Sequence, residues 1–288
     1  MCTPGIPGRV RVRGQRARPR FVERQSRIAN HSVRAGFTLL ELLIVIVIVA
    51  ILLVLMAPAF TSIRRGTDIT SAAYTIKGVL DAARTYAKAN NTYTWVGFYE
   101  EDVSSGTPGT AGTGRVVMSI VASKDGTKVY DANSTSIDPT RLIQVGKIVK
   151  IENIHLGLLP LGTGTGDTFD SRPSPTPAPV NDSRFGELNA LNGFPTAPTT
   201  NSQYPFQYPV GSPAPLAQYT FQKTLQFNPR GESNINSGLG VGPVTYDVKR
   251  IVEVGLQATH GTQVDTISPN LVAVQITGFG GSVKIYRR

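Results

Sequence analysis

The chain has 288 residues, of which 40% are hydrophobic and 17% are charged, and its formal net charge is +10. A charge of this size would suit nucleic-acid binding, but it is not spread over the whole chain. Residues 1–36 hold nine arginines and one acidic residue, a balance of +8 that leaves +2 for everything after them. The remainder is close to neutral and has no basic stripe that could follow phosphates. We therefore predict no nucleic-acid partner.

The basic stretch 1–36 lacks the apolar core and small-residue cleavage site of an ordinary secretory signal peptide. Arginines that flank an apolar segment stay on the cytoplasmic side of a membrane, so we expect the N-terminus inside and the C-terminus outside. Cys2 is the only cysteine. The chain after residue 36 is thus predicted to have no disulfide and no thiolate chemistry.

A long apolar run follows, from Phe37 to Phe60, and residues 42–57 contain no polar side chain at all. The β-branched residues in this run would also suit a buried strand. A helix of this length reaches roughly 35 Å, enough to cross a hydrocarbon core of about 30 Å. Buried strands of more than about ten residues are rare. The run therefore predicts a membrane-spanning helix over residues 37–60.

Glu41 is the one charged residue near the start of this run. A carboxylate at the centre of a membrane helix costs roughly 2.5–3.5 kcal/mol, so such residues usually have a partner. We expect no partner for Glu41 within its own segment. Cleavage after Gly36 would create an α-amino group on Phe37, one helical turn away. In a helical assembly, the Glu41 carboxylate of one subunit could then face the Phe37 amine of its neighbour.

Residues 36–41 read Gly-Phe-Thr-Leu-Leu-Glu, between a basic leader and the apolar run. This pattern resembles the signature of type IV prepilins and type II secretion pseudopilins. The resemblance implies cleavage between Gly36 and Phe37 by prepilin peptidase, N-methylation of Phe37, and a role for Glu41 in setting subunit register. It implies two further partners, namely other pilin or pseudopilin subunits and the inner-membrane assembly platform. Pro58 lies where many pilins carry a helix-loosening proline. The alternative is an uncleaved signal anchor whose Glu41 faces lipid headgroups.

The helical pattern resumes after Pro58, which is expected to bend or loosen the helix around Ala57–Phe60. Between Ile69 and Ala87 apolar residues recur at three- and four-residue steps, which predicts one amphipathic face over residues 61–91. Asn90-Asn91 is the predicted end of the helix. The second half of this helix should pack on a globular head.

The head, residues 92–288, is predicted to be β-rich. The expected fold is α+β and pilin-like, with a long N-terminal helix packed on an antiparallel sheet. Residues 162–215 hold ten of the twenty prolines, which predicts a long excursion or mobile loop. Five aromatic residues could pin parts of it to the head. They are Phe185, Phe194, Tyr204, Phe206 and Tyr208. The expected strands are 93–99, 115–122 and 127–130 (a hairpin with Asp125-Gly126 at its turn), 147–151, 219–227, 248–256, 271–277 and 282–286.

Three short segments carry a second resemblance. Residues 80–87 contain Ala-Arg-x-x-Ala, residues 227–231 form an F-x-P-x-G turn, and residues 277–286 resemble a final glycine-containing hairpin. Together they are similar to minor pseudopilins of the GspH/FimT type.

We find no pattern that indicates an enzyme. His155 and His260 lack the paired spacing that metal sites favour, and we interpret them as surface or satisfied core residues. The glycine-rich stretches 162–167 and 238–242 lack the features of phosphate cradles and are interpreted as loops. Glu100-Glu101-Asp102 could meet Ca²⁺, but a solvated turn is the favoured interpretation. No Gly-x-Ser-x-Gly elbow occurs. We predict no catalytic residue, no metal and no cofactor.

The leading hypothesis is a structural subunit, a minor pseudopilin of a type II secretion pseudopilus. It would be a single-pass protein of the bacterial inner membrane with a periplasmic head. The alternatives are a minor pilin of a type IV pilus and a tip-displayed binding module that uses the proline-rich excursion.

Overall fold

The structure is a computed structural model. It describes residues 38–128, 138–175, 184–185, 206–211, 216–221, 223–236, 246–247 and 250–288, except the side chains of residues 55–68, 185, 236, 246 and 247. The chain falls into two compact units, Met1–Leu53 and Val54–Arg288. The first contains the beginning of a long helix, and the second contains the rest of that helix and the β-rich head.

Helix α1 spans Leu39–Ala89. It is one long helix, as the sequence predicted. The helical assignment runs without a break through Pro58, so the loosened turn expected around Ala57–Phe60 does not end the helix. A bend at that place stays a prediction. The helix ends where Asn90-Asn91 predicted it. Asn91 adopts a left-handed φ of 48°, and the Thr92 N–H bonds to the Ala87 carbonyl, which is the hydrogen bond of a Schellman cap.

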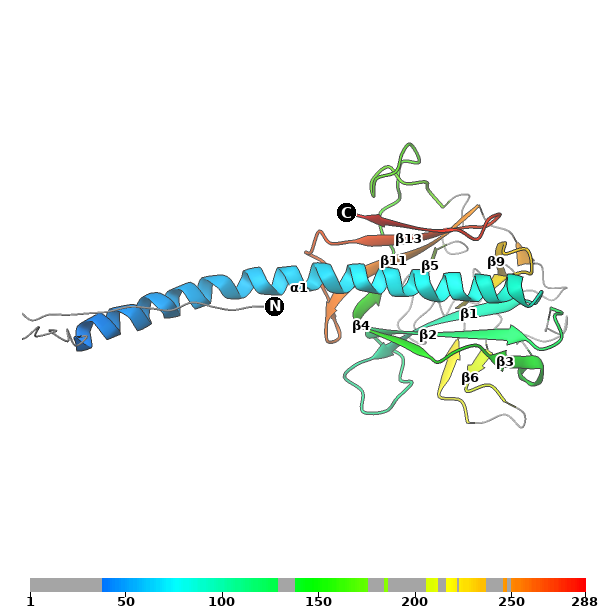
Figure 1. Cartoon of the computed structure of the whole chain (residues 1–288), viewed down its shortest axis with the longest axis horizontal. Helices are drawn as coiled ribbons and strands as arrows, with labels where there is room; N and C mark the ends of the chain where they lie inside the picture. The colour runs from blue at the N-terminus through cyan, green and yellow to red at the C-terminus, as the bar shows by residue number, and fades with distance from the viewer. Residues whose placement is uncertain are drawn as a thin grey trace, which may run out of the picture. The chain divides into compact units, whose positions relative to one another are not determined.

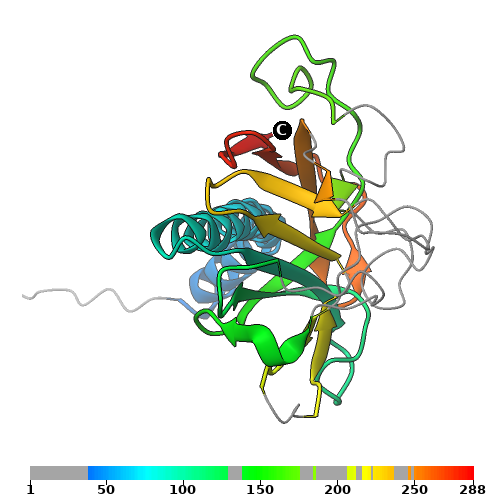
Figure 2. The same cartoon turned by 90° about the vertical axis from the view of Figure 1, so that its right-hand side faces the viewer.

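The amphipathic face of the second half of α1 is confirmed. Ile76, Leu80 and Ala83 are completely buried, while Tyr86, which the pattern placed on the same face, is only half-buried. These residues pack against side chains from both ends of the sheet, which makes one continuous core. In Figure 2 this part of α1 is seen nearly end-on beside the strands. The buried helix residues are Ile69, Ala72, Ala73, Ile76, Val79, Leu80, Ala83 and Ala87.

The head is one large sheet with a small ribbon beside it, and Figure 1 labels most of its strands. The described strands of the large sheet follow the order β10-β9-β8-β1-β2-β4-β11-β13-β14, with β3 on β2 and with β5 and β12 on β11. All described pairs are antiparallel except β5 with β11, so the predicted antiparallel sheet is confirmed. The bounds are β1 Thr94–Asp102, β2 Gly114–Ser123, β3 Leu142–Gln144, β4 Val149–Leu156, β5 Arg184–Phe185, β6 Phe206–Tyr208, β7 Tyr219–Phe221, β8 Lys223–Phe227, β9 Ser233–Asn236, β10 Tyr246–Asp247, β11 Ile251–His260, β12 Gln263–Val264, β13 Val272–Thr277 and β14 Val283–Arg287.

Both faces of the sheet are buried. Successive side chains of a strand point to opposite faces, so Val96 and Phe98 of β1 belong to the core that holds α1, while Trp95 and Tyr99 belong to a second core. The β6–β7 ribbon belongs to this second core. It lies so close to Gly97 that a Cβ atom there would be 2.5 Å from Cβ of Phe221. A glycine is needed at this position because the ribbon occupies the space of a side chain.

The ribbon confirms part of the expectation for the proline-rich excursion. Phe206 is buried and Tyr208 is half-buried, so the end of the excursion is pinned to the head by aromatic packing. The side chains of Phe185, Phe194 and Tyr204 lie outside the described residues.

The predicted hairpin around Asp125-Gly126 is wrong for the described residues, because Thr127 and Lys128 are not in a strand. Residues 129–130 lie outside the description. The end of β2 pairs instead with β3, at Ser123 with Leu142. The Asp125 carboxylate accepts hydrogen bonds from Ser123 and Thr127 and pairs with Arg141. It thereby ties the turn to the short 3-10 helix before β3.

Other strand boundaries shift by a few residues. The strand expected at 147–151 is β4, which continues to Leu156, and the one expected at 248–256 begins at Ile251 and continues to His260. Residues 248–249 lie outside the description. The expected closing hairpin is β13 and β14.

Candidate functional site

The start of α1 is shaped by a capping box. Thr38 precedes the first helical residue, and its backbone N–H and its hydroxyl both donate to Oε2 of Glu41, at 3.0 and 3.1 Å. In return the Glu41 N–H donates to the Thr38 hydroxyl at 3.2 Å. These reciprocal bonds satisfy backbone groups that a helix N-terminus otherwise leaves without partners. They hold the helix start at Leu39.

The expectation that Glu41 has no partner within its own segment is therefore wrong. The spacing Thr-x-x-Glu is itself the sequence signal of a capping box, and it identifies Thr38 as the partner. Both hydrogen bonds from Thr38 go to Oε2, so Oε1 takes part in neither of them. Gly36 and Phe37 lie outside the described residues. Cleavage between them and the pairing of Glu41 with a neighbouring amine stay predictions.

The first half of α1 exposes an apolar surface on all its sides. Each described side chain from Thr38 to Val54 is exposed, and the exposed fractions of its large hydrophobic residues run from 47% at Val47 to 81% at Leu39. Exposed apolar surface of this extent marks a region that a membrane or another protein covers.

Within the part of the chain that the structure describes, no helix has both the length and the apolar character needed to cross a membrane. The span expected over residues 37–60 stays a prediction.

The second half of α1 is held by two glycine-containing turns of the head. Nε of Arg84 donates to the Gly231 carbonyl at 3.3 Å, and a Cβ atom on Gly281 would lie 2.1 Å from that same oxygen. Two turns earlier on the helix, the Lys77 ammonium donates to the Val283 carbonyl at 3.0 Å. The turns come from opposite ends of the strand order, after β8 and after β13. The three segments that carry the second resemblance, 80–87, 227–231 and 277–286, thus meet at one place.

The acidic residues Glu100 and Glu101 are not in a solvated turn, and that interpretation is wrong. They lie in β1 and are 2% and 1% exposed. Glu100 Oε1 is 2.7 Å from Nδ1 of His155, and its other oxygen accepts a bond from the Leu156 N–H at 3.4 Å. Burial raises the pKa of Glu100, and the hydrogen bond with His155 only partly offsets this. His155 is thus a satisfied core histidine, as one of the two interpretations predicted.

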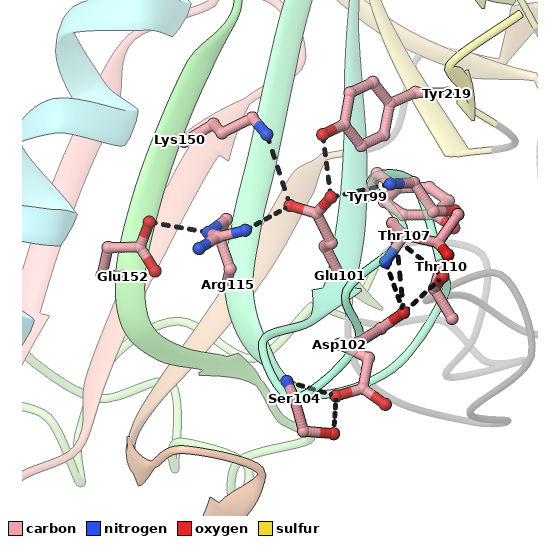
Figure 3. A network of polar contacts seen from close by, with 12 residues as sticks. Tyr99, Glu101, Asp102, Ser104, Thr107, Thr110, Arg115, Lys150, Glu152 and Tyr219 are labelled. Atoms are coloured by element: carbon pink, nitrogen blue, oxygen red, sulfur yellow. Dashed lines mark hydrogen bonds and ion pairs between the residues drawn. The ribbon is translucent and has the colours of Figure 1, made fainter.

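Glu101 joins four separate segments, and Figure 3 shows its contacts. Its carboxylate accepts hydrogen bonds from Arg115 at 2.8 Å, from the Tyr219 hydroxyl at 2.9 Å and from the Gly109 N–H at 2.7 Å. The Lys150 ammonium lies 3.5 Å away. Burial alone would raise the pKa of Glu101, but these donors together hold it below its usual range. The network fastens β7 and the loop before β2 to the sheet.

Asp102, the third acidic residue, is turned to other partners. It accepts hydrogen bonds from the N–H and the hydroxyl of Ser104, at 2.8 and 2.6 Å. The three acidic residues Glu100, Glu101 and Asp102 therefore have separate hydrogen-bond partners and do not act as one cluster. Over the described ranges, no group of three His, Cys, Asp or Glu side chains could hold a metal ion. His260 lies exposed at the end of β11.

A buried ion pair anchors the first part of the proline-rich excursion. No local pattern in the sequence indicated this pair. Arg172 and Glu253 are 0% and 1% exposed, and Nε of Arg172 donates to Glu253 Oε2 at 2.7 Å. The same guanidinium donates to the carbonyls of Phe169 at 2.6 Å and Pro160 at 2.5 Å. Gln275 donates to the Glu253 carboxylate at 2.8 Å. Phe169 and Arg172 are therefore anchored in the core, while residues 163–168 between them and the sheet are exposed.

The glycine-rich stretch 162–167 is a loop, as predicted. It folds back on itself, since the Thr163 N–H bonds to the Asp170 carbonyl and the Gly164 N–H to that of Arg172. The second glycine-rich stretch, 238–242, lies outside the described residues.

Residues 31–57 match the family model of the prokaryotic N-terminal methylation motif. The chain carries a prepilin-type methylation motif. No curated protein and no solved structure matches the chain. The motif implies an inner-membrane-anchored precursor that prepilin peptidase processes and that assembles with other pilins. The matched residues do not include the three segments that resemble the GspH/FimT type.

The methylation motif and the structure coincide at the capping box. The match includes Gly36 and Phe37, which lie outside the described residues, and Thr38 and Glu41, which the structure joins. It ends at Ala57, just before Pro58. The motif thus contains the exposed apolar part of α1 and leaves out the part that packs on the head.

Proposed function

We propose that this chain is a structural subunit of a pilin-type filament, and in finer terms a minor pseudopilin of a type II secretion pseudopilus. The observation that carries this proposal is a methylation motif placed on a helix whose first half is exposed and apolar. The same helix then packs its second half on an antiparallel sheet. This α+β arrangement is pilin-like. The first half of the helix would assemble with other subunits, and the β-rich head would be displayed on the filament.

Assembly through the helix follows from the physics of apolar helices. Spanning helices gain little from hydrophobic burial against one another in lipid, so they associate by close packing and by polar contacts. Glu41 is the polar residue available for such a contact. Because the capping box uses only Oε2, the other oxygen can accept the Phe37 amine of a neighbouring subunit while the helix start stays intact. Pairing with an amine lowers the cost of burying the carboxylate.

Processing is tested by mass spectrometry of the N-terminus of the protein isolated from membranes. We expect a mature chain that begins at N-methylated Phe37. A Gly36→Leu variant, whose small residue before the scissile bond is replaced by a bulky one, serves as the matched control and should keep its leader. If the wild-type protein retains its arginine-rich leader, both the cleavage and the filament role are refuted.

Co-purification tests the finer assignment. After mild cross-linking in the native host, a minor pseudopilin should be recovered with other pseudopilins of the secretion system. Recovery with type IV pilins instead would refute the secretion role and leave the filament role standing. In both cases we expect no enzymatic activity of the subunit itself, since its proposed role requires only assembly.

A further inference from the structure

We draw no further inference here: the strongest candidate, the pair of buried amide side chains of Gln226 on β8 and Asn234 on β9, has polar atoms without a hydrogen-bond partner in the described part of the chain, but nothing in the structure shows what covers this patch.

Discussion

The buried pair of Arg172 and Glu253 makes a strong prediction about the stability of the head. In an Arg172→Met variant the methionine fills part of the space, but the Glu253 carboxylate loses both hydrogen bonds from Arg172, at 2.7 and 3.1 Å. The carbonyls of Phe169 and Pro160 lose their donor at the same time. Removing one partner of a buried ion pair costs about 3–5 kcal/mol. We expect a loss in the free energy of unfolding within that range.

Urea unfolding measures this loss, and the chain contains its own probe. Trp95 is the single tryptophan and is completely buried in the core beneath the β6–β7 ribbon. Its fluorescence should report unfolding of the head as a shift in the urea midpoint at unchanged slope. Arg287→Met, at an exposed position of β14, is the matched control and should change stability by less than about 0.5 kcal/mol.

A double variant separates the ion pair from the packing around it. When Glu253→Leu is added to Arg172→Met, no uncompensated carboxylate remains, so part of the lost stability should return. Arg184 limits the recovery, because its guanidinium lies 3.5 Å from Glu253 and would lose that charge partner. The reasoning is refuted if Arg172→Met unfolds within about 1 kcal/mol of the wild type.

Three other changes test separate parts of the structure. Glu41→Ala should leave the protein in the membrane fraction but reduce its incorporation into filaments, and wild-type incorporation on shearing and blotting would contradict the pairing. Gly97→Ala should lower the free energy of unfolding by about 1–3 kcal/mol, because the new methyl group meets Phe221. The control Gly78→Ala has nothing within 4 Å of its new methyl group and should stabilise the helix by roughly 0.8–1 kcal/mol. Equal effects of the two variants in urea titrations would rule out the close packing at Gly97. Glu100→Gln tests the raised pKa. The folded protein holds the Glu100 proton more tightly than the unfolded chain, so this stabilising contribution is complete below pH 4.5 and is lost as pH rises through the raised pKa. As the pH rises through the pKa of Glu100, the wild type should therefore lose stability relative to the Glu100→Gln variant. Parallel curves of urea midpoint against pH for the two proteins would refute the raised pKa.

The long helix and its two halves could be predicted because their signals are local. The apolar run, the three- and four-residue spacing after Ile69 and the paired asparagines at 90–91 each act within a few residues of one another. The capping box of Thr38 and Glu41 belongs to the same class, and its spacing was available in the sequence.

The buried polar groups could not be predicted, because their partners are distant in sequence. Glu101 is 118 residues from Tyr219, and Arg172 is 81 residues from Glu253. A run of acidic residues in isolation is typical of a solvated turn. Only the sheet brings cations and hydroxyls close enough to offset the cost of burying a carboxylate. The anchoring of Arg172 within the proline-rich excursion could not be predicted for the same reason, since its partner Glu253 lies 81 residues further along the chain.

The two glycine turns that grip α1 have a mechanical consequence. Arg84 and Lys77 contact segments that follow β8 and β13, at opposite ends of the strand order. A pull along the second half of the helix would act on the segments after β8 and after β13 together, because the Ser233 N–H that follows the first turn donates to the Gly278 carbonyl of the second at 2.7 Å. Force on the helix would thus reach two parts of the head that are far apart in the strand order.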